Sequence, residues 1–368
     1  MRVLYDGWSL VHHTLGPESL HLLSILENLP EDISPILAVP QPVPDWQALA
    51  RIEISPSAYT PWGQLRWEQL LLPSLAKDID ADLVHLATPA APAFTRQKTV
   101  FSPAGYGAGV GSWGGLVSPD PDAHHVLSRL RRSLGMGGLE QVTRILWPDD
   151  LPSPAPHKPV SQLSPILPWD FLNPENNSMD VSGDLQLPEE FILYHGPGGK
   201  QRIDLLVQAW NWAAGAIGEY YPLLLIGLDD NDMQIITEMR ARFDLGDTIQ
   251  ELPGVLPANL PQIYRQSRAV FHPIPASPWC GPTRLAMAAG KPLVSIEHQM
   301  TAAIVGSAAY LVRENDARAL GAALVTVVVE EELAERLSAA ALKVYRSWDS
   351  GNFTDQLRLF YLGAHHNG

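Results

Sequence analysis

The chain has 368 residues, of which 46% are hydrophobic and 18% charged, and its net charge is −15 at pH 7. This composition is typical of a globular protein and excludes a largely disordered chain. The single cysteine, Cys280, excludes an internal disulfide and a zinc site made of cysteines. The acidic excess argues against a general nucleic-acid-binding surface, although a few cations and helix N-termini suffice for a local anion site.

The N-terminus carries no targeting signal that we recognise. Residues Met1–Gly7 lack the apolar core of a signal peptide, and no uncharged apolar run is long enough to span a membrane. We therefore expect a cytoplasmic protein without a transmembrane segment, which leaves room for peripheral contact with a membrane.

The first half alternates between buried strands and amphipathic helices. Apolar residues at helical spacing predict helices over residues 17–28 and Trp67–Leu75. Strands are expected at Arg2–Tyr5, Ile33–Val39, Asp82–Leu86 and Lys98–Phe101. Strands that alternate with helices imply crossover connections and a mainly parallel sheet.

A stretch rich in Pro, Ser and Asn, Pro148–Ser182, breaks this pattern. Such a composition favours a connection between domains. We therefore predict an N-terminal α/β domain over residues 1–172, a linker over 173–183 and a C-terminal α/β domain over 184–349.

The second half restarts the alternation more regularly. Helices are expected at Ile203–Trp212, Met233–Phe243, Leu260–Gln266, Thr283–Ala289 and Ala317–Val329, and five strands at 191–195, Leu223–Gly227, Thr248–Leu252, Ala269–His272 and Pro292–Ile296. Both halves are thus expected to be doubly wound, Rossmann-like α/β domains that face a cleft. In such sheets ligands bind beyond the carboxyl ends of the strands.

The segment Tyr194–Asp204 is the strongest motif for a bound anion. A strand leads through a glycine-rich turn, which begins at Gly196, into a helix that carries Lys200 and Arg202. Backbone N–H groups and a helix N-terminus favour phosphate, and the two cations add charge. The alternative is a solvent-exposed connection with ordinary surface cations.

A second candidate segment runs from Phe271 to Pro292. Its loop leads into a helix at Pro282, where N–H groups near Gly281 and Thr283, with Arg284 in the first turn, form an anion site. An ordinary strand–loop–helix crossover explains this pattern equally well.

Three other patterns indicate no cofactor or metal. The glycines of Gly109–Gly114 match a dinucleotide-binding pattern, but Pro119 follows and no helix opens there, so a glycine-rich loop is the better interpretation. The adjacent histidine pairs are interpreted as surface residues. Asp229–Asp232 lacks the glycine and the terminal glutamate of a calcium loop and is interpreted as a polar turn.

Several segments together resemble glycosyltransferases of the GT-B fold, in the large retaining family 4 group. The segments that carry the resemblance are Leu4–Gly7, Trp67–Pro73, Asp82–His85, Leu193–Gly196, Leu260–Ala269, Ala286–Val294 and Val305–Val312. The resemblance implies transfer of a sugar from a nucleotide-diphosphate sugar to a hydroxyl of a carbohydrate or lipid-linked acceptor. It also implies retention at the anomeric carbon, no divalent metal, and a C-terminal segment, 350–368, that packs back on the N-terminal domain.

The resemblance also suggests where the donor binds, while no residue is assigned as the catalytic group. The diphosphate is expected at Gly196, Lys200, Arg202, Gly281, Thr283 and Arg284. The base or ribose is expected at Gly254, Val255 and Leu285, and the donor sugar at Ser277 and Trp279.

Some positions depart from the pattern of the family. Ser277 and Leu285 stand where the resemblance places two glutamates of the donor loop, and Ala303 stands at a third. A leucine cannot hydrogen-bond a ribose hydroxyl, and leaving that hydroxyl unpaired costs about 1–3 kcal/mol. The alternative function is therefore a catalytically inactive relative that acts as a binding or assembly partner.

Overall fold

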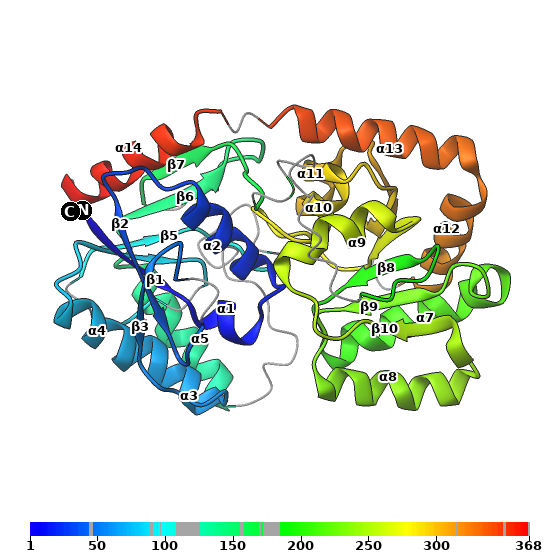
Figure 1. The fold of residues 1–368 in the computed structure, drawn as a ribbon, viewed down its shortest axis with the longest axis horizontal. Coiled ribbons are helices and arrows are strands. Elements are labelled where there is room, and N and C mark those ends of the chain that lie inside the picture. Colours follow the sequence, from blue (N-terminus) through cyan, green and yellow to red (C-terminus); the bar gives the residue numbers. More distant parts are fainter. Residues whose placement is uncertain are drawn as a thin grey trace. The chain divides into compact units, whose positions relative to one another are not determined.

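The computed structural model describes residues 1–43, 47–88, 91–93, 95, 97–107, 126–154, 158–168, 171, 185–313, 316–348 and 351–366. The chain divides into two compact units (Figure 1). Unit 1 comprises Met1–Pro168, Pro278–Cys280 and Asp349–Gly368, and unit 2 comprises Trp169–Ser277 and Gly281–Trp348. The expected linker and the glycines of Gly109–Gly114 lie outside the described residues.

Unit 1 contains a parallel sheet in the order β3-β2-β1-β4-β5-β6-β7 within the described residues. Its central strands read as continuous apolar runs because helices cover a parallel sheet on both faces. The strands are β1 (Arg2–Asp6), β2 (Ser34–Val39), β3 (Arg51–Ile54), β4 (Leu83–Leu86), β5 (Thr99–Phe101), β6 (Arg144–Pro148) and β7 (Val160–Leu163).

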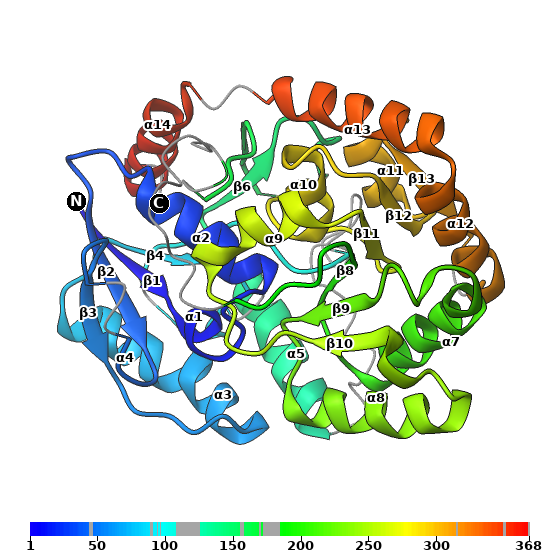
Figure 2. The ribbon, with the colours of Figure 1, turned by 45° about the vertical axis from the view of Figure 1, so that its right-hand side comes forward.

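The helices of unit 1 connect these strands. They are α1 (Trp8–His12), α2 (Pro17–Glu27), α3 (Pro61–Arg66), α4 (Leu72–Asp78), α5 (Val126–Leu139) and α14 (Phe353–His366), with a π-helical turn at Trp67–Leu71 between α3 and α4. The helix α14 packs against β7 and lies beside it in Figure 1, and Figure 2 shows α14 from a second direction.

Unit 2 contains a second parallel sheet in the order β10-β9-β8-β11-β12-β13 within its described residues. Its strands are β8 (Ile192–His195), β9 (Leu223–Ile226), β10 (Ile249–Glu251), β11 (Ala269–His272), β12 (Leu293–Ile296) and β13 (Ala309–Val312). Its helices are α7 (Lys200–Ile217), α8 (Asp230–Phe243), α9 (Leu260–Gln266), α10 (Pro282–Ala288), α11 (Gln299–Val305), α12 (Ala317–Val329) and α13 (Glu331–Arg346). The helix α7 packs against α8 and α12, and α10 packs against α11 and α13.

The prediction of two doubly wound α/β domains is confirmed. The prediction of five strands in the second half is wrong, because β13 adds a sixth within the described residues, and β7 lies inside the stretch that we interpreted as irregular. Both strands, and the unpredicted β3, lie at sheet edges with exposed or half-exposed residues. An edge strand is covered less than a central one, so its hydrophobic pattern is weak.

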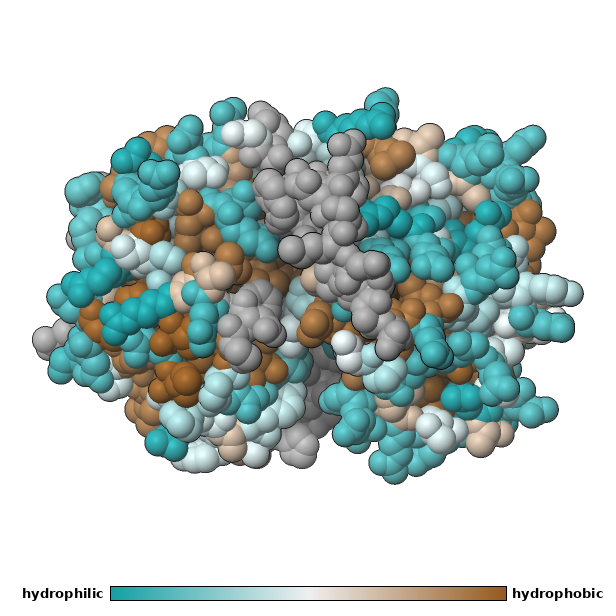
Figure 3. Space-filling view, viewed as in Figure 1, coloured by the Kyte–Doolittle hydropathy of each residue, from teal (hydrophilic) through white to brown (hydrophobic). Residues whose placement is uncertain are grey.

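The surface is of the kind expected for a globular protein of this composition. On the face drawn in Figure 3, hydrophobic side chains are scattered among hydrophilic ones. Within the described residues, no helix combines the length and the apolar character needed to cross a membrane.

A buried polar network joins α14 to the first sheet. The Tyr361 hydroxyl accepts a hydrogen bond from the Tyr5 hydroxyl at 2.9 Å and lies 2.7 Å from Nδ1 of His85. Nε2 of His85 lies 2.8 Å from the Ser102 hydroxyl, which also contacts Nε2 of His21 at 2.9 Å. Burial lowers the pKa of His85 to about 3, so its ring is neutral and can both donate and accept.

We expect Tyr361→Phe to lower the free energy of unfolding by about 1–3 kcal/mol, because it leaves two buried polar groups without their partner. Chemical denaturation followed by circular dichroism measures this. The control is Leu359→Ala on the same helix, where the side chain is 67% exposed and the change should stay within about 0.5 kcal/mol. Equal stability of Tyr361→Phe and the wild type would contradict the role of the network.

Candidate functional site

The second sheet has its topological switch point at β8. This strand lies between β9 and β11, so the connections that leave β8 and β11 depart in opposite directions from adjacent strands. Ligands of open α/β sheets bind beyond the carboxyl ends of such strands. The turn after β8, Gly196–Gly199, is called the glycine loop below, and it leads directly into α7.

The glycine loop is held by side chains from three elements. The Tyr194 hydroxyl donates to the carbonyl of Pro197 at 2.6 Å, and Nη1 of Arg202 donates to the carbonyl of Gly198 at 3.2 Å. The backbone N–H of Gly199 donates to Oδ1 of Asp232 at 2.8 Å. Gly199 has a φ of +100°, a region that favours glycine. The sequence motif therefore forms a fixed turn at the start of an 18-residue helix.

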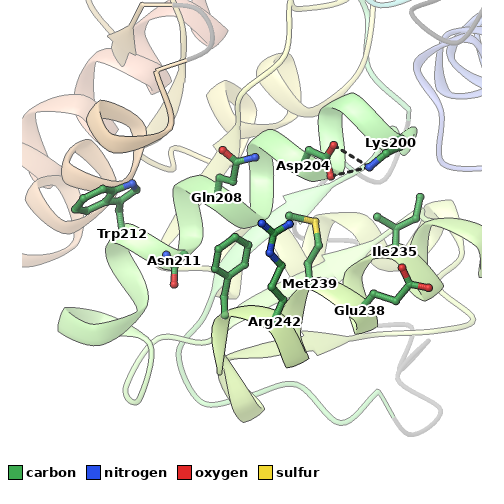
Figure 4. A pocket seen from close by; sticks show the side chains of 10 residues that line it. Lys200, Asp204, Gln208, Asn211, Trp212, Ile235, Glu238, Met239 and Arg242 are labelled. Carbon is green, nitrogen blue, oxygen red and sulfur yellow. Dashed lines mark hydrogen bonds and ion pairs between the residues drawn. The ribbon is translucent and has the colours of Figure 1, made fainter.

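The two cations of this motif point in different directions. The ammonium of Lys200 pairs with Asp204 at 3.1 Å, one turn further along α7. Both side chains line a groove of about 690 Å³ between α7 and α8, and Figure 4 shows them turned toward each other there. Arg202 instead bonds the glycine loop itself. Of the two predicted cations, only Arg202 has a charged group that contacts the glycine loop in the described hydrogen bonds.

Two histidines end the strands at the switch point. His195 is the last residue of β8 and His272 the last residue of β11, and both are buried. Nδ1 of His195 lies 2.8 Å from the hydroxyl of Tyr264. Burial, with smaller effects of His195 and Arg202, lowers the pKa of His272 to about 3, so its ring is neutral. Neither histidine was predicted for the site: each ends an apolar run in the sequence, but the adjacency of the two strands appears only in the structure.

The second predicted anion segment begins at the end of β11 and leads into α10. Thr283, Arg284 and Leu285 are buried in the first turns of α10, with exposed fractions of 2%, 0% and 0%. The guanidinium of Arg284 lies over the ring of Trp348, 4.9 Å from its centre. Oγ1 of Thr283 has no hydrogen-bond partner among the described residues. Gly281, which precedes the helix, has a φ of +119°.

The remaining predicted residues lie in three places. Ser277 is buried in the loop that leads to Gly281 and belongs to unit 2. Trp279 belongs to unit 1, where its ring stacks on His21 with ring centres 4.7 Å apart. Gly254 and Val255 follow β10 at the edge of the second sheet, and Gly254 has a φ of +71°. The structure thus brings the loops of Gly196 and Gly281 to adjacent strand ends, while Gly254 and Val255 follow the outermost strand.

Comparison with solved structures gives chains of the same fold over nearly their whole length. Sucrose-phosphate synthase from Thermosynechococcus elongatus is 13% identical, with a TM-score of 0.64 over 98% of each chain. The Anabaena protein HepE in complex with UDP-glucose is 15% identical, with a TM-score of 0.65 over 99% of this chain and all of the other. WaaG, a glycosyltransferase involved in lipopolysaccharide biosynthesis, is 10% identical, with a TM-score of 0.64 over all of both chains.

A sequence search of curated proteins gave no match. The family model described as "Glycosyl transferases group 1" matches residues 190–330, which include the glycine loop, β8–β13 and α7–α12. Residues 190–330 therefore form a glycosyl transferases group 1 domain, in a chain that has the two-domain GT-B fold.

Proposed function

We propose that this protein transfers a sugar from a nucleotide-diphosphate sugar to a hydroxyl group of a carbohydrate or lipid-linked acceptor in the cytoplasm. The observation that carries the proposal is the glycine loop at the start of α7, inside a glycosyl transferases group 1 domain, with Arg202 bonded to it. A structural neighbour, HepE, was solved with UDP-glucose and with UDP, which supports a uridine nucleotide as the first donor to test.

The leaving group of this reaction needs stabilisation by positive charge. The bond between the anomeric carbon and the diphosphate oxygen breaks, and a bond from the acceptor oxygen to the same carbon forms. The acceptor hydroxyl gives its proton to an oxygen of the leaving diphosphate or to water, and the diphosphate takes the electron pair of the broken bond. Preorganised N–H donors and cations stabilise such charge. We assign this role to Arg202 and the glycine loop, and propose retention at the anomeric carbon with no divalent metal.

The second loop provides further candidates for the donor. Gly281, Thr283 and Arg284 follow the strand next to β8, and the buried hydroxyl of Thr283 has no partner in the described part of the chain. A ligand oxygen is one group that would satisfy it. We keep Ser277 and Trp279 as candidates for the sugar, and Gly254, Val255 and Leu285 as candidates for the nucleoside.

A second candidate function is a catalytically inactive glycosyltransferase-like protein that acts as a binding or assembly partner. The observation that favours it is the fully buried, apolar side chain of Leu285 at a position where the resemblance places a carboxylate. Ser277 stands at the other such position in the same loop. We expect the loss of these carboxylates to weaken both sugar transfer and donor binding. Measuring transfer and binding separately therefore distinguishes the enzyme from the inactive relative.

We expect a cognate nucleotide to stabilise the protein against unfolding. At 100 times its dissociation constant, a ligand that binds only the folded state adds about 2.7 kcal/mol to the free energy of unfolding. Denaturation in the presence of UDP, GDP and their sugar conjugates measures this. No stabilisation by any of them would contradict a working donor site, whereas stabilisation without sugar transfer would favour the inactive alternative.

We expect Arg202→Ala to weaken nucleotide binding by about tenfold or more, because hydrogen bonds from a charged group contribute about 1.5–3 kcal/mol. The matched control is Lys200→Ala, which removes the same charge two residues away. Its ammonium is exposed and paired with Asp204, so its loss should change affinity by about twofold at most. Calorimetric titration measures both, and the opposite ranking would reassign the diphosphate contact to Lys200.

A further inference from the structure

A carboxylate of the chain itself already contacts the glycine loop. We propose that Asp232 competes with the donor for the amide of Gly199, so that a diphosphate must displace this carboxylate before it can bind there. This inference rests on the proposed function, because it places the diphosphate at the glycine loop.

Both carboxylate oxygens of Asp232 lie close to the glycine loop. Oδ1 accepts the Gly199 N–H at 2.8 Å, and a Cβ on Gly198 would lie only 1.6 Å from Oδ2. Gly198 therefore must lack a side chain if Asp232 is to lie where it does. The carboxylate is buried, with 6% of the residue exposed. The Asp232 carboxylate thus already binds the N–H of Gly199 at the start of α7, which is a group that would otherwise bind an anion.

Asp232 can leave the loop without unfolding its own helix. It is the third residue of α8, and its backbone N–H donates to Oδ1 of Asp229 at 2.9 Å, which caps the helix. Oδ2 of Asp232 accepts from the backbone N–H of Asp229 at 3.4 Å. A rotation of the side chain away from Gly199 breaks the 2.8 Å bond and the longer bond from the Asp229 N–H, but it leaves the bond from Asp229 Oδ1 to the α8 backbone in place.

The electrostatic setting favours such a release. Burial raises the pKa of Asp232, and the neighbouring Asp229 raises it further, against the lowering effect of the Gly199 N–H. The ionised carboxylate is therefore held in a place that is less favourable to it than water. A diphosphate carries more charge and more acceptor oxygens than one carboxylate, so it gains more from the same amide and from Arg202.

The test is the affinity for inorganic pyrophosphate, which needs no knowledge of the sugar or base. We expect Asp232→Asn to lower the dissociation constant of pyrophosphate by about tenfold or more in calorimetric titration, because it removes a charge-assisted competitor. The matched control is Asp230→Asn, which removes the same charge from the same turn of α8 at an exposed position. Its effect should stay within about threefold, as expected for general electrostatic attraction near the surface.

Equal affinities of Asp232→Asn and Asp230→Asn would overturn the proposal, because the gain would then come from net charge alone. Asp232→Ser serves as a second variant if Asp232→Asn fails to fold, since it also removes the carboxylate and serine has a helix propensity no lower than that of aspartate. An unchanged pyrophosphate affinity in the serine variant would likewise overturn it.

The same variants separate this inference from the proposed function. Tighter pyrophosphate binding by Asp232→Asn, with no binding of UDP, GDP or their sugars by any variant, supports the competition and contradicts the donor site. Equal nucleotide binding by the wild type and Asp232→Asn, with equal pyrophosphate binding, contradicts the competition and leaves the donor site intact.

Discussion

The turn from β8 into α7 depends on residues without side chains, because an acidic side chain from another helix lies against it. Gly198 makes room for Asp232, and Gly199 adopts a positive φ that turns its N–H toward the carboxylate. The position of Arg202 follows from the same turn, since its guanidinium bonds the carbonyl of Gly198. The backbone of this turn therefore determines where both charged side chains, Asp232 and Arg202, contact the glycine loop.

The sequence allowed most of the central architecture to be predicted. The strands β1, β8 and β11 are apolar runs that end at glycine or polar residues, and the structure has them within one residue of the expected bounds. The strands β3, β7 and β13 lie at sheet edges, where partial exposure weakens the apolar pattern. Local pattern therefore identified most of the buried strands, but it missed β6, which lies between β5 and β7. Three of the four edge strands were also missed, because their pairing depends on neighbours that are distant in the chain.

The candidate site shows the same division. The glycine-rich turn and its cations were readable from residues 194–204, because a strand, a turn and a helix follow one another there. The interpretation of Asp229–Asp232 as a polar turn is wrong, because Asp229 caps α8 and Asp230–Asp232 lie in its first turn. It also missed the contact between Asp232 and Gly199, which are 33 residues apart. The different roles of Lys200 and Arg202 also depend on where Asp204 and the loop carbonyls lie in space. The spacing of four residues between Lys200 and Asp204 is typical of an ion pair on a helix, whereas the bond from Arg202 to Gly198 depends on the shape of the turn.

The polar network of unit 1 has a consequence for the order in which the protein is made. Tyr5 and Tyr361 share a hydrogen bond although 356 positions separate them, and all of unit 2 is encoded between β7 and α14. During synthesis the first sheet leaves the ribosome long before the hydroxyl that pairs with His85 exists. Unit 1 therefore completes its buried network only after unit 2 has been translated, when Tyr361 joins Tyr5 and His85.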